Sequence, residues 1–515
     1  MIQIPVFRAP IVRAFVSGVQ TRALRRASRR LGRLLLAGSA MALLAGCLAP
    51  TNYTAPSFGF GDGYGRAGKA GGKFGRSGPV LLSNAMWWQR LQDPVLDGLI
   101  AEALKQNYSL REAREKVVEA RATLGTVPAP DGSLRVSLDG KLTGKDTASE
   151  TLGLSWMLDP WGGNLASRKS AMASYEIAAA EADAAQLLVI YNLANAYLNL
   201  RYRQEVLGLR EQELSMRRRT LGLTRALAQS SEATKLDITR SRARVADIEA
   251  RLPEARAAIT ATQNEIAVLT GHAPGHLPVS VGRAPQPRVS LSPEVGIPAD
   301  LLRNRPDIRI SERVYYGAIA EIDVARAALY PTLSLTGAIT VNALASGASA
   351  TSYYLGPAIQ FPALPATGKA RVEARHSAAR QAHLAWSSTV LGAIMEVENA
   401  LVDYRASTEA LAAAARATGL YGDALNLRRR LVEAGEATLS DLIDAEQELS
   451  AAEDLRAQMR FQQARAFVDL NVRLGSGSRV GKDGDPMPGG VASSARIDPE
   501  PQTQTQAQVR AANGG

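Results

Sequence analysis

The hydrophobic pattern repeats every seven residues over a long stretch in the first half of the chain. Ile238, Val245, Leu252, Ile259 and Ile266 follow one another at this interval. A strict seven-residue repeat is typical of helices that coil around each other with a left-handed twist. The pattern therefore predicts a long helix that buries its apolar side against a second long helix.

Two further stretches have the composition of unusually long helices. Residues 164–229 and 369–433 contain no proline and little glycine, and they are rich in Ala, Leu, Glu and Arg. At about 1.5 Å per residue, each would extend on the order of 100 Å. Helices of this length cannot bury their apolar seams within a globule. We therefore expect them to pair as helical hairpins.

The same helical phrase occurs twice. SEATKLDITRSRARV begins at Ser231, and GEATLSDLIDAEQEL begins 204 residues later at Gly435. This register holds without a gap from Asn195 against Asn399 to the end of each half. An internal two-fold repeat is therefore predicted. The phrase marks the tips of two hairpins, near residues 230 and 435, and glycine relieves the second turn.

Four segments of about ten residues alternate imperfectly between apolar and polar side chains, two in each half. These predicted strands are residues 133–142, 150–158, 332–341 and 351–361. About ten residues suffice for a tilted strand to cross a membrane, but a small soluble hairpin in each half would explain the alternation equally well. Four strands cannot close a barrel, and lipid cannot hydrate open edges, so a membrane location requires several chains to pool their strands.

The predicted organisation places the two repeats between less regular segments. The boundaries are a signal peptide at 1–46, a lipid anchor and Gly-rich tether at 47–86, repeat 1 at 87–271, a Pro-rich linker at 272–298, repeat 2 at 299–475 and a disordered tail at 476–515. Each repeat is expected to run from a helix through two strands to a long helical hairpin. Pro253 predicts a kink or break in repeat 1 only, because Ala457 stands at the equivalent place.

The net charge of +11 belongs mostly to the leader and not to a nucleic-acid surface. The first 46 residues carry eight arginines and no acidic residue, which leaves +3 for the rest of the chain. The apolar run Leu34–Gly46 is too short to span a bilayer but suits a signal peptide. Leu-Ala-Gly-Cys47 resembles a bacterial lipobox, which implies lipidation of Cys47, and Leu48 after it favours the outer membrane. The alternatives are an ordinary leader with a chance cysteine and, from SRRLGRLLL, a twin-arginine export route.

The sequence contains no recognisable catalytic or metal site. Cys47 is the single cysteine, and Pro274 and Gly275 separate the histidine pair His272 and His276. The remaining pair, seven residues apart, has no carboxylate arranged as in a metalloprotease. We therefore expect no enzyme activity, no cofactor and no metal.

Several motifs together resemble the outer membrane factor, or TolC, family, in its NodT/OprM-like lipoprotein branch. They are DPVLDGLIAEALKQNYSLREA from Asp93, LDPWGGN from Leu158, LLRNRPDIRISE from Leu301, ARAALYPTLSLTG from Ala325 and EVENALVDY from Glu396. The resemblance covers about residues 87–475. It implies a homotrimer with a 12-stranded outer-membrane β-barrel continued by a long periplasmic α-helical barrel. It also implies an exit duct for drugs, metals or other small solutes, with a periplasmic adaptor protein and an inner-membrane pump of the resistance-nodulation-division (RND) type as partners.

The resemblance also implies functional residues at the hairpin tips. Asp441 and Asp444 fall where family members constrict the periplasmic end of the duct, and positions i and i+3 share a helix face. Their ordinary alternative is a solvated helix face near a turn. The expected adaptor-docking residues are Ser230, Ser231 and Glu232 at the first tip and Ala434, Gly435 and Glu436 at the second.

The chain departs from the family pattern at two places, and two other functions stay open. Some relatives hold the tip shut with a tyrosine and an arginine, where this chain has Val432 and Ala437. The stretch ATLGTVPAPDGSL is about seven residues shorter than the family norm. The alternative functions are the outer-membrane component of type I protein secretion and, from a different class, a lipid-anchored coiled-coil scaffold that forms no pore. A hydrolase is a distant third.

Overall fold

The computed structural model describes most of the two predicted repeats. The described residues are 86–130, 132–143, 147–230, 233–289, 304–344, 349–362 and 365–478. The leader, Cys47, almost all of the tether, Ser231, Glu232 and the tail beyond Ser478 lie outside them. The chain divides into two compact units, a strand unit of residues 128–166 and 323–372, and a helical unit containing the other described residues.

The helical unit begins with three short helices. They are the 3-10 helix η2 (Trp87–Leu91), α2 (Pro94–Gln106) and α3 (Tyr108–Thr126). Asp93 caps α2 by accepting a hydrogen bond from the backbone N–H of Val95, with proline as the first helical residue. The prediction of one opening helix was wrong. Asn107 splits it, because its side chain accepts from Leu110 N at 3.0 Å and donates to Leu269 O at 2.8 Å.

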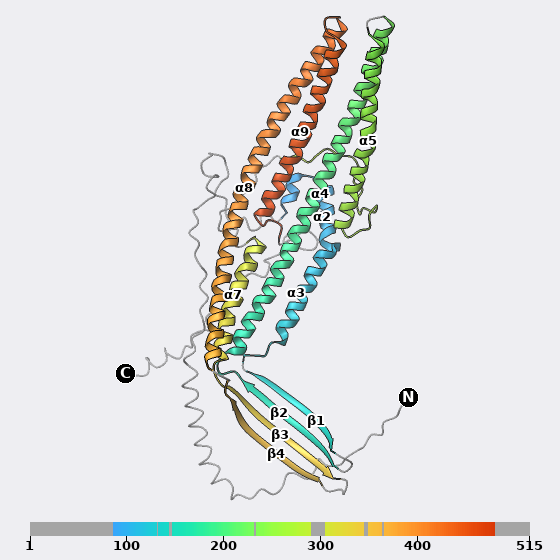
Figure 1. Ribbon diagram of the computed structural model, residues 1–515. Coiled ribbons are helices and arrows are strands. Elements are labelled where there is room, and N and C mark those ends of the chain that lie inside the picture. Colours follow the sequence, from blue (N-terminus) through green and yellow to red (C-terminus); the bar gives the residue numbers. More distant parts are fainter. Residues whose placement is uncertain are drawn as a thin grey trace, which may run out of the picture. The chain divides into compact units, whose positions relative to one another are not determined.

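Two long helical hairpins form the rest of this unit. Hairpin 1 consists of α4 (Gly163–Gln229) and α5 (Lys235–Leu269), and hairpin 2 consists of α8 (Pro365–Glu433) and α9 (Leu439–Arg473). A shorter helix, α7 (Pro306–Ala327), precedes the strands of the second half. Both hairpins turn at the same end of the helical unit (Figure 1). Helix α5 continues through Pro253, so no break occurs there.

The seven-residue repeat fills the seam of hairpin 1. Val245 and Leu252 of α5 are buried with Ile248 against Leu214 and Leu221 of α4. In hairpin 2 the corresponding seam contains Leu425, Leu442 and Ala445. Burying an aliphatic side chain of this size contributes roughly 1.5–3 kcal/mol relative to leaving it in water. The seams therefore stabilise the part of each hairpin next to its tip.

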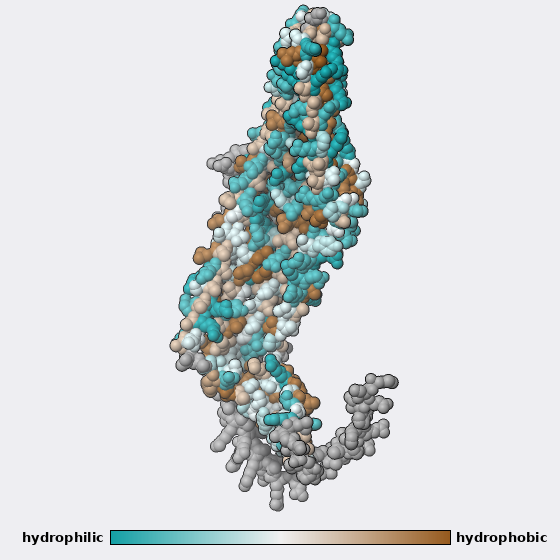
Figure 2. Space-filling model, turned by 45° about the vertical axis from the view of Figure 1, so that its right-hand side comes forward, coloured by the Kyte–Doolittle hydropathy of each residue, from teal (hydrophilic) through white to brown (hydrophobic). Residues whose placement is uncertain are grey.

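The largest hydrophobic cluster lies where η2 and α2 cover the long helices. It includes Trp87, Leu96 and Ile100 together with Leu193 of α4 and Phe467 of α9. The Trp87 ring meets the Phe467 ring edge-on, with centroids 6.2 Å apart. Hydrophilic side chains otherwise predominate along the face of the hairpins shown in Figure 2, interrupted by separate hydrophobic patches.

The strand unit is a single antiparallel sheet. Its strands are β1 (Ser133–Thr143), β2 (Thr147–Leu158), β3 (Thr332–Leu344) and β4 (Ser349–Gln360), in the spatial order β1-β2-β3-β4. Strands β2 and β3 come from different halves of the chain and pair along their length, with Trp156 opposite Leu335. The two halves therefore build one sheet and not two separate hairpins.

Candidate functional site: sheet faces, helix seam and hairpin tips

The pairing register sorts the sheet into one apolar and one polar face. Residues directly opposite each other on neighbouring strands share a face, and successive residues alternate between faces. Three alternate rows across all four strands are almost entirely apolar: Leu134, Trp156, Leu335, Pro357; Val136, Leu154, Gly337, Leu355; and Leu138, Leu152, Ile339, Tyr353. Most of their large side chains are exposed, Leu138 by 76% and Tyr353 by 84%.

The rows between them are mainly polar or small. They are Arg135, Ser155, Thr336, Gly356; Ser137, Gly153, Ala338, Tyr354; and Asp139, Thr151, Thr340, Ser352. On this face the hydroxyls of Thr151 and Thr340 lie 3.0 Å apart, within hydrogen-bond distance. An exposed apolar face opposite a polar one is what a strand between lipid and water requires. Within the described sheet, β1 and β4 each leave one edge unpaired.

The second helix of each hairpin, α5 or α9, starts with the same capping box. Thr234 caps α5 and Thr438 caps α9, and in each case the aspartate three residues later bonds back to the threonine backbone N–H. Asp441 accepts from Thr438 N at 2.9 Å and from its hydroxyl at 2.8 Å. The backbone and side-chain hydrogen bonds from Thr438 lower the pKa of Asp441. The repeated Thr-x-x-Asp motif is therefore a helix start signal. It is visible in the sequence, but it was interpreted there only as part of a hairpin tip.

The tip of hairpin 2 ends in a glycine turn. Gly435 has a φ of 75°, and Gly435 N and Glu436 N donate to the carbonyls of Val432 and Leu431. This Schellman arrangement requires the left-handed conformation that glycine adopts without strain, as predicted. Asp444, one turn after Asp441, is exposed.

The two hairpins are joined by ion pairs between α4 and α9. Glu205 meets Arg460 at 3.2 Å, Arg210 meets Asp454 at 2.5 Å, and Arg217 meets Glu446 at 3.0 Å. Across these three pairs the residue numbers on α4 increase while those on α9 decrease, so the two helices pack antiparallel in one continuous register. The ring of Tyr202 stacks on Phe461 in the same seam, with centroids 4.9 Å apart.

The pair nearest the tips is buried. Arg217 is 5% exposed and Glu446 is 2% exposed. The hydroxyl of Thr220 donates to the second Glu446 oxygen at 2.7 Å, and Glu213 lies 3.5 Å from the guanidinium of Arg217. Burial raises the pKa of Glu446, against the opposing effects of Thr220 and Arg217. A pair buried in this way is costly to break, because removing one partner leaves the other charge uncompensated.

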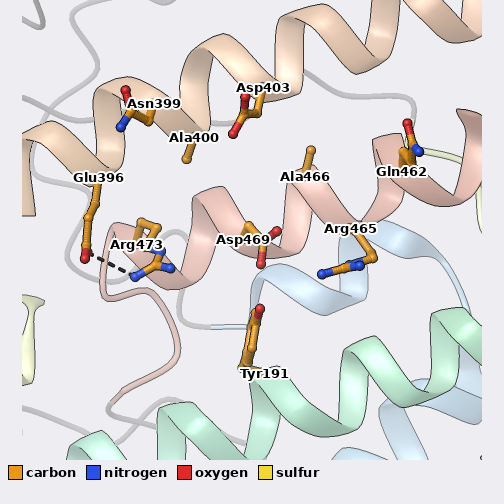
Figure 3. A pocket seen from close by; sticks show the side chains of 10 residues that line it. All are labelled: Tyr191, Glu396, Asn399, Ala400, Asp403, Gln462, Arg465, Ala466, Asp469 and Arg473. Carbon is orange, nitrogen blue, oxygen red and sulfur yellow. Dashed lines mark ion pairs between the residues drawn. The ribbon is translucent and has the colours of Figure 1, made fainter.

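A cavity of about 370 Å³ opens between α8, α9 and the middle of α4, near Tyr191. Figure 3 shows Glu396 and Asp403 of α8 facing Arg473 and Asp469 of α9, with Tyr191 of α4 pointing toward Asp469. Glu396 and Arg473 form an ion pair at 3.1 Å. A second cavity of about 520 Å³ lies between α4, α5 and α9 and is lined by three asparagines of α4, Asn192, Asn195 and Asn199.

Comparison with known proteins identifies the class. The family model for outer membrane efflux proteins matches residues 99–272 and 297–476. Nodulation protein T of Rhizobium leguminosarum bv. trifolii is 31% identical over 453 residues, covering 84% of this chain and 95% of the relative. The pyoverdine export outer membrane protein OpmQ of Pseudomonas aeruginosa is 29% identical, over 77% of this chain and 88% of its own length.

Solved structures agree with this assignment. The outer-membrane channel OprN superposes with a TM-score of 0.72 at 27% identity, covering 84% of this chain and all of OprN. The open state of the MtrE outer membrane channel of Neisseria gonorrhoeae gives a TM-score of 0.71 at 25% identity, over 84% of this chain and 98% of MtrE.

The chain belongs to the outer membrane efflux protein family, which confirms the resemblance drawn from the sequence. It is an outer-membrane exit duct of a tripartite efflux system and extends from the outer membrane into the periplasm.

Sequence reasoning did not find the contacts between α4 and α9. The arginines and acids that pair across this seam were visible as charges, but nothing along the chain showed which helices would be neighbours. The predicted tip residues Ser230, Ala434, Gly435 and Glu436 are exposed at the hairpin ends. Ser231 and Glu232 lie outside the described residues.

Proposed function

We propose that three copies of this chain assemble into one continuous duct. The twelve strands close a β-barrel in the outer membrane, and the six hairpins form a helical tube in the periplasm. The observation that supports this best is the sheet with an exposed apolar face and a polar opposite face. In a closed barrel the apolar rows face lipid and the polar rows face water, and no strand edge remains unpaired. Antiparallel pairing of β4 with β1 of the next copy closes the ring.

An exposed apolar stripe on α8 of hairpin 2 also supports assembly of several chains. Along α8, Leu384, Leu391, Met395 and Val402 follow the 7-4-7 spacing of a coiled-coil seam. Their exposed fractions are 67, 63, 58 and 38% in the single chain. A helix of a neighbouring copy, α5, would cover this stripe and continue the helical wall.

The tips are the proposed periplasmic gate and docking region. In a trimer, Asp441 and Asp444 form two stacked rings of carboxylates in a narrow aqueous throat, which attract cations. The exposed residues around Ser230 and Glu436 dock a periplasmic adaptor, which connects the duct to an RND-type pump. Because Val432 and Ala437 supply no tyrosine–arginine latch, the ion pairs between α4 and α9 hold hairpin 2 against hairpin 1. The cargo is a small solute, and an acyl chain on Cys47 adds a membrane anchor.

The barrel is tested by placing the same charge on opposite faces of one strand. Val136 belongs to an apolar row and Ser137 to a polar row, where it is exposed and lies opposite Gly153. Val136→Arg should abolish assembly, because arginine at the middle of a lipid-facing strand costs about 2–4 kcal/mol in each copy. Ser137→Arg should still give a trimer of heat-modifiable mobility in gels.

Mass measurement and imaging in detergent complete the test. The wild type and Ser137→Arg are expected as elongated trimers. Equal tolerance of both substitutions, or a single-chain particle that is stable without detergent, would contradict the barrel. The Cys47→Ala variant should remain in the outer membrane if the strands span it, whereas a scaffold held only by an acyl chain would be washed off.

A further inference from the structure

The helical wall has one covered and one open face at the level of the largest hydrophobic cluster. Side chains two positions apart on a helix differ in direction by about 200°. On α9, Phe467 faces Trp87 of the covering helix η2, so Arg465 and Asp469 point away from that cover. On α4, Tyr197 bonds to Asp93, which places Asn195 and Asn199 on the far side. The face opposite η2 and α2 is therefore polar and uncovered by described residues.

Both cavities open on this uncovered face, and they share Arg465. The first spans α8, α9 and α4, and the second spans α9, α4 and α5. Arg465 is exposed, and its guanidinium lies 5.8 Å from the centroid of the Phe461 ring. Because Phe461 is stacked on Tyr202, the arginine rests on a fixed platform. In Figure 3 its side chain extends toward Tyr191 and Asp469.

The same face of α9 continues to the tip. Asp441 precedes Asp469 by 28 residues and Asp444 precedes Arg465 by 21 residues, both multiples of seven. Under left-handed coiling, residues at multiples of seven lie on one line along the helix. The line from Asp441 to Asp469 passes through Glu448, Leu455 and Gln462. The line from Asp444 to Arg465 passes through Ala451 and Gln458. Arg465 is thus the single cation among the positions of these two lines from 441 to 469.

We propose that Arg465 is a second charge-selecting residue of the duct, and that it binds carboxylate and similar anionic groups on solutes in transit. This inference rests on the proposed trimer, in which the uncovered face lines the lumen and three copies of Arg465 form a ring. At about 1.5 Å per residue, this ring lies about 30 Å from Asp444 along α9. The acidic tip disfavours anions, and Arg465 provides the opposite charge further along the path.

The internal repeat shows that this cation is specific to hairpin 2. In the register of 204, Arg465 corresponds to Ala261, whereas the carboxylate of Asp469 corresponds to Glu265. The duplication therefore kept an acid at this level in both halves and an arginine in one. The repeat supplies a matched pair of substitutions: Arg465→Ala removes the charge, and Ala261→Arg adds one on the exposed side of α5.

The test is ion selectivity of trimers reconstituted in planar bilayers, with a potassium chloride gradient and then with acetate in place of chloride. Arg465→Ala and Arg465→Gln should each lower the anion-to-cation permeability ratio by about twofold or more, and Arg465→Glu should lower it further. Arg465→Lys should stay near the wild type, and Ala261→Arg should raise the ratio. Arg256→Gln, which removes an exposed cation of α5, serves as the matched control and should have no effect.

The outcomes separate this inference from the duct itself. If Asp441→Asn with Asp444→Asn raises the anion ratio while Arg465→Gln and Arg465→Glu leave it unchanged, the duct stands and the role of Arg465 is wrong. If the wild type forms no trimer and no channel, the proposed assembly fails first. A shift with Arg256→Gln as large as that with Arg465→Gln would also overturn the proposal, because the effect would then be general surface charge.

Discussion

Helices α5 and α9 are the returning helices of the two hairpins, and they differ in chemistry although their geometry is the same. Each is 35 residues long and starts with a Thr-x-x-Asp capping box. Over 235–256, α5 carries six basic and four acidic residues, whereas over the equivalent 439–460, α9 carries two basic and six acidic residues. Twelve residues of α9 are buried, against seven of α5.

The difference follows from the number of neighbours along the hairpin. Helix α5 packs mainly on α4, whereas α9 packs on both α8 and α4. Residues 214–229 of α4, next to the tip, carry four arginines and no acid, so the acidic α9 is their electrostatic complement. The two helices therefore share their length and their capping box, and their different charges decide which of them joins the hairpins. The following predictions test this division.

The largest effect is expected at Glu446, whose equivalent on α5 is the exposed Arg242. Glu446→Ala leaves the buried Arg217 uncompensated and should destabilise the protein by about 3–5 kcal/mol. Arg242→Ala should change stability by less than about 0.5 kcal/mol. Thermal unfolding in detergent measures both. Replacing both partners, Arg217→Met with Glu446→Leu, should restore most of the loss; a double variant no better than the single one would contradict the pairing.

A smaller effect is expected from exchanging proline and alanine between the two helices. Ala457 is fully buried, and its carbonyl accepts a hydrogen bond from Gln286 at 2.9 Å. Ala457→Pro should cost about 3 kcal/mol, because it removes a helical N–H and crowds the preceding turn. Pro253→Ala on exposed α5 should raise the melting temperature by restoring that donor. If Ala457→Pro is tolerated as well as Pro253 is, α9 is not the more constrained helix.

The caps should contribute equally in both hairpins. Thr438→Ala and Thr234→Ala each remove the same capping bonds and should each cost about 1 kcal/mol locally. Hydrogen exchange of tip peptides, followed by mass spectrometry, reports this fraying. Ser440→Ala, at an exposed position beside the cap, is the control. Loss of protection in only one hairpin would show that its tip depends on contacts other than the cap.

The smallest effect concerns pH and again separates α9 from α5. Burial raises the pKa of Glu446 above the ordinary glutamate value. The folded state then holds this proton more tightly than the unfolded state, so stability falls as pH rises from the ordinary value to the raised one. Glu446→Gln should lack this change, and the two melting curves should diverge only in that window. A difference that is constant between pH 4 and 7 would count against the raised pKa.

The sequence predicted much of the local structure. The expected strand at 332–341 lies within β3, and the predicted helix at 164–229 differs from α4 by one residue. The turn at Gly435 followed from its position between two helical patterns. These features depend on side chains close in sequence, where periodicity and glycine placement act directly. The capping aspartates were visible in the same way, but Asp441 was interpreted only through the family resemblance.

By itself, the sequence determined the hairpins and the family, because seven-residue periodicity and family motifs depend only on the order of residues along the chain. Only the tertiary structure decided which face of each strand is apolar across the whole sheet, since that depends on register between segments nearly 200 residues apart. It also decided that α4 meets α9 and that Arg465 faces away from the covering helices. Those contacts join residues up to 255 positions apart, and no local pattern specifies which of several charged helices will be neighbours.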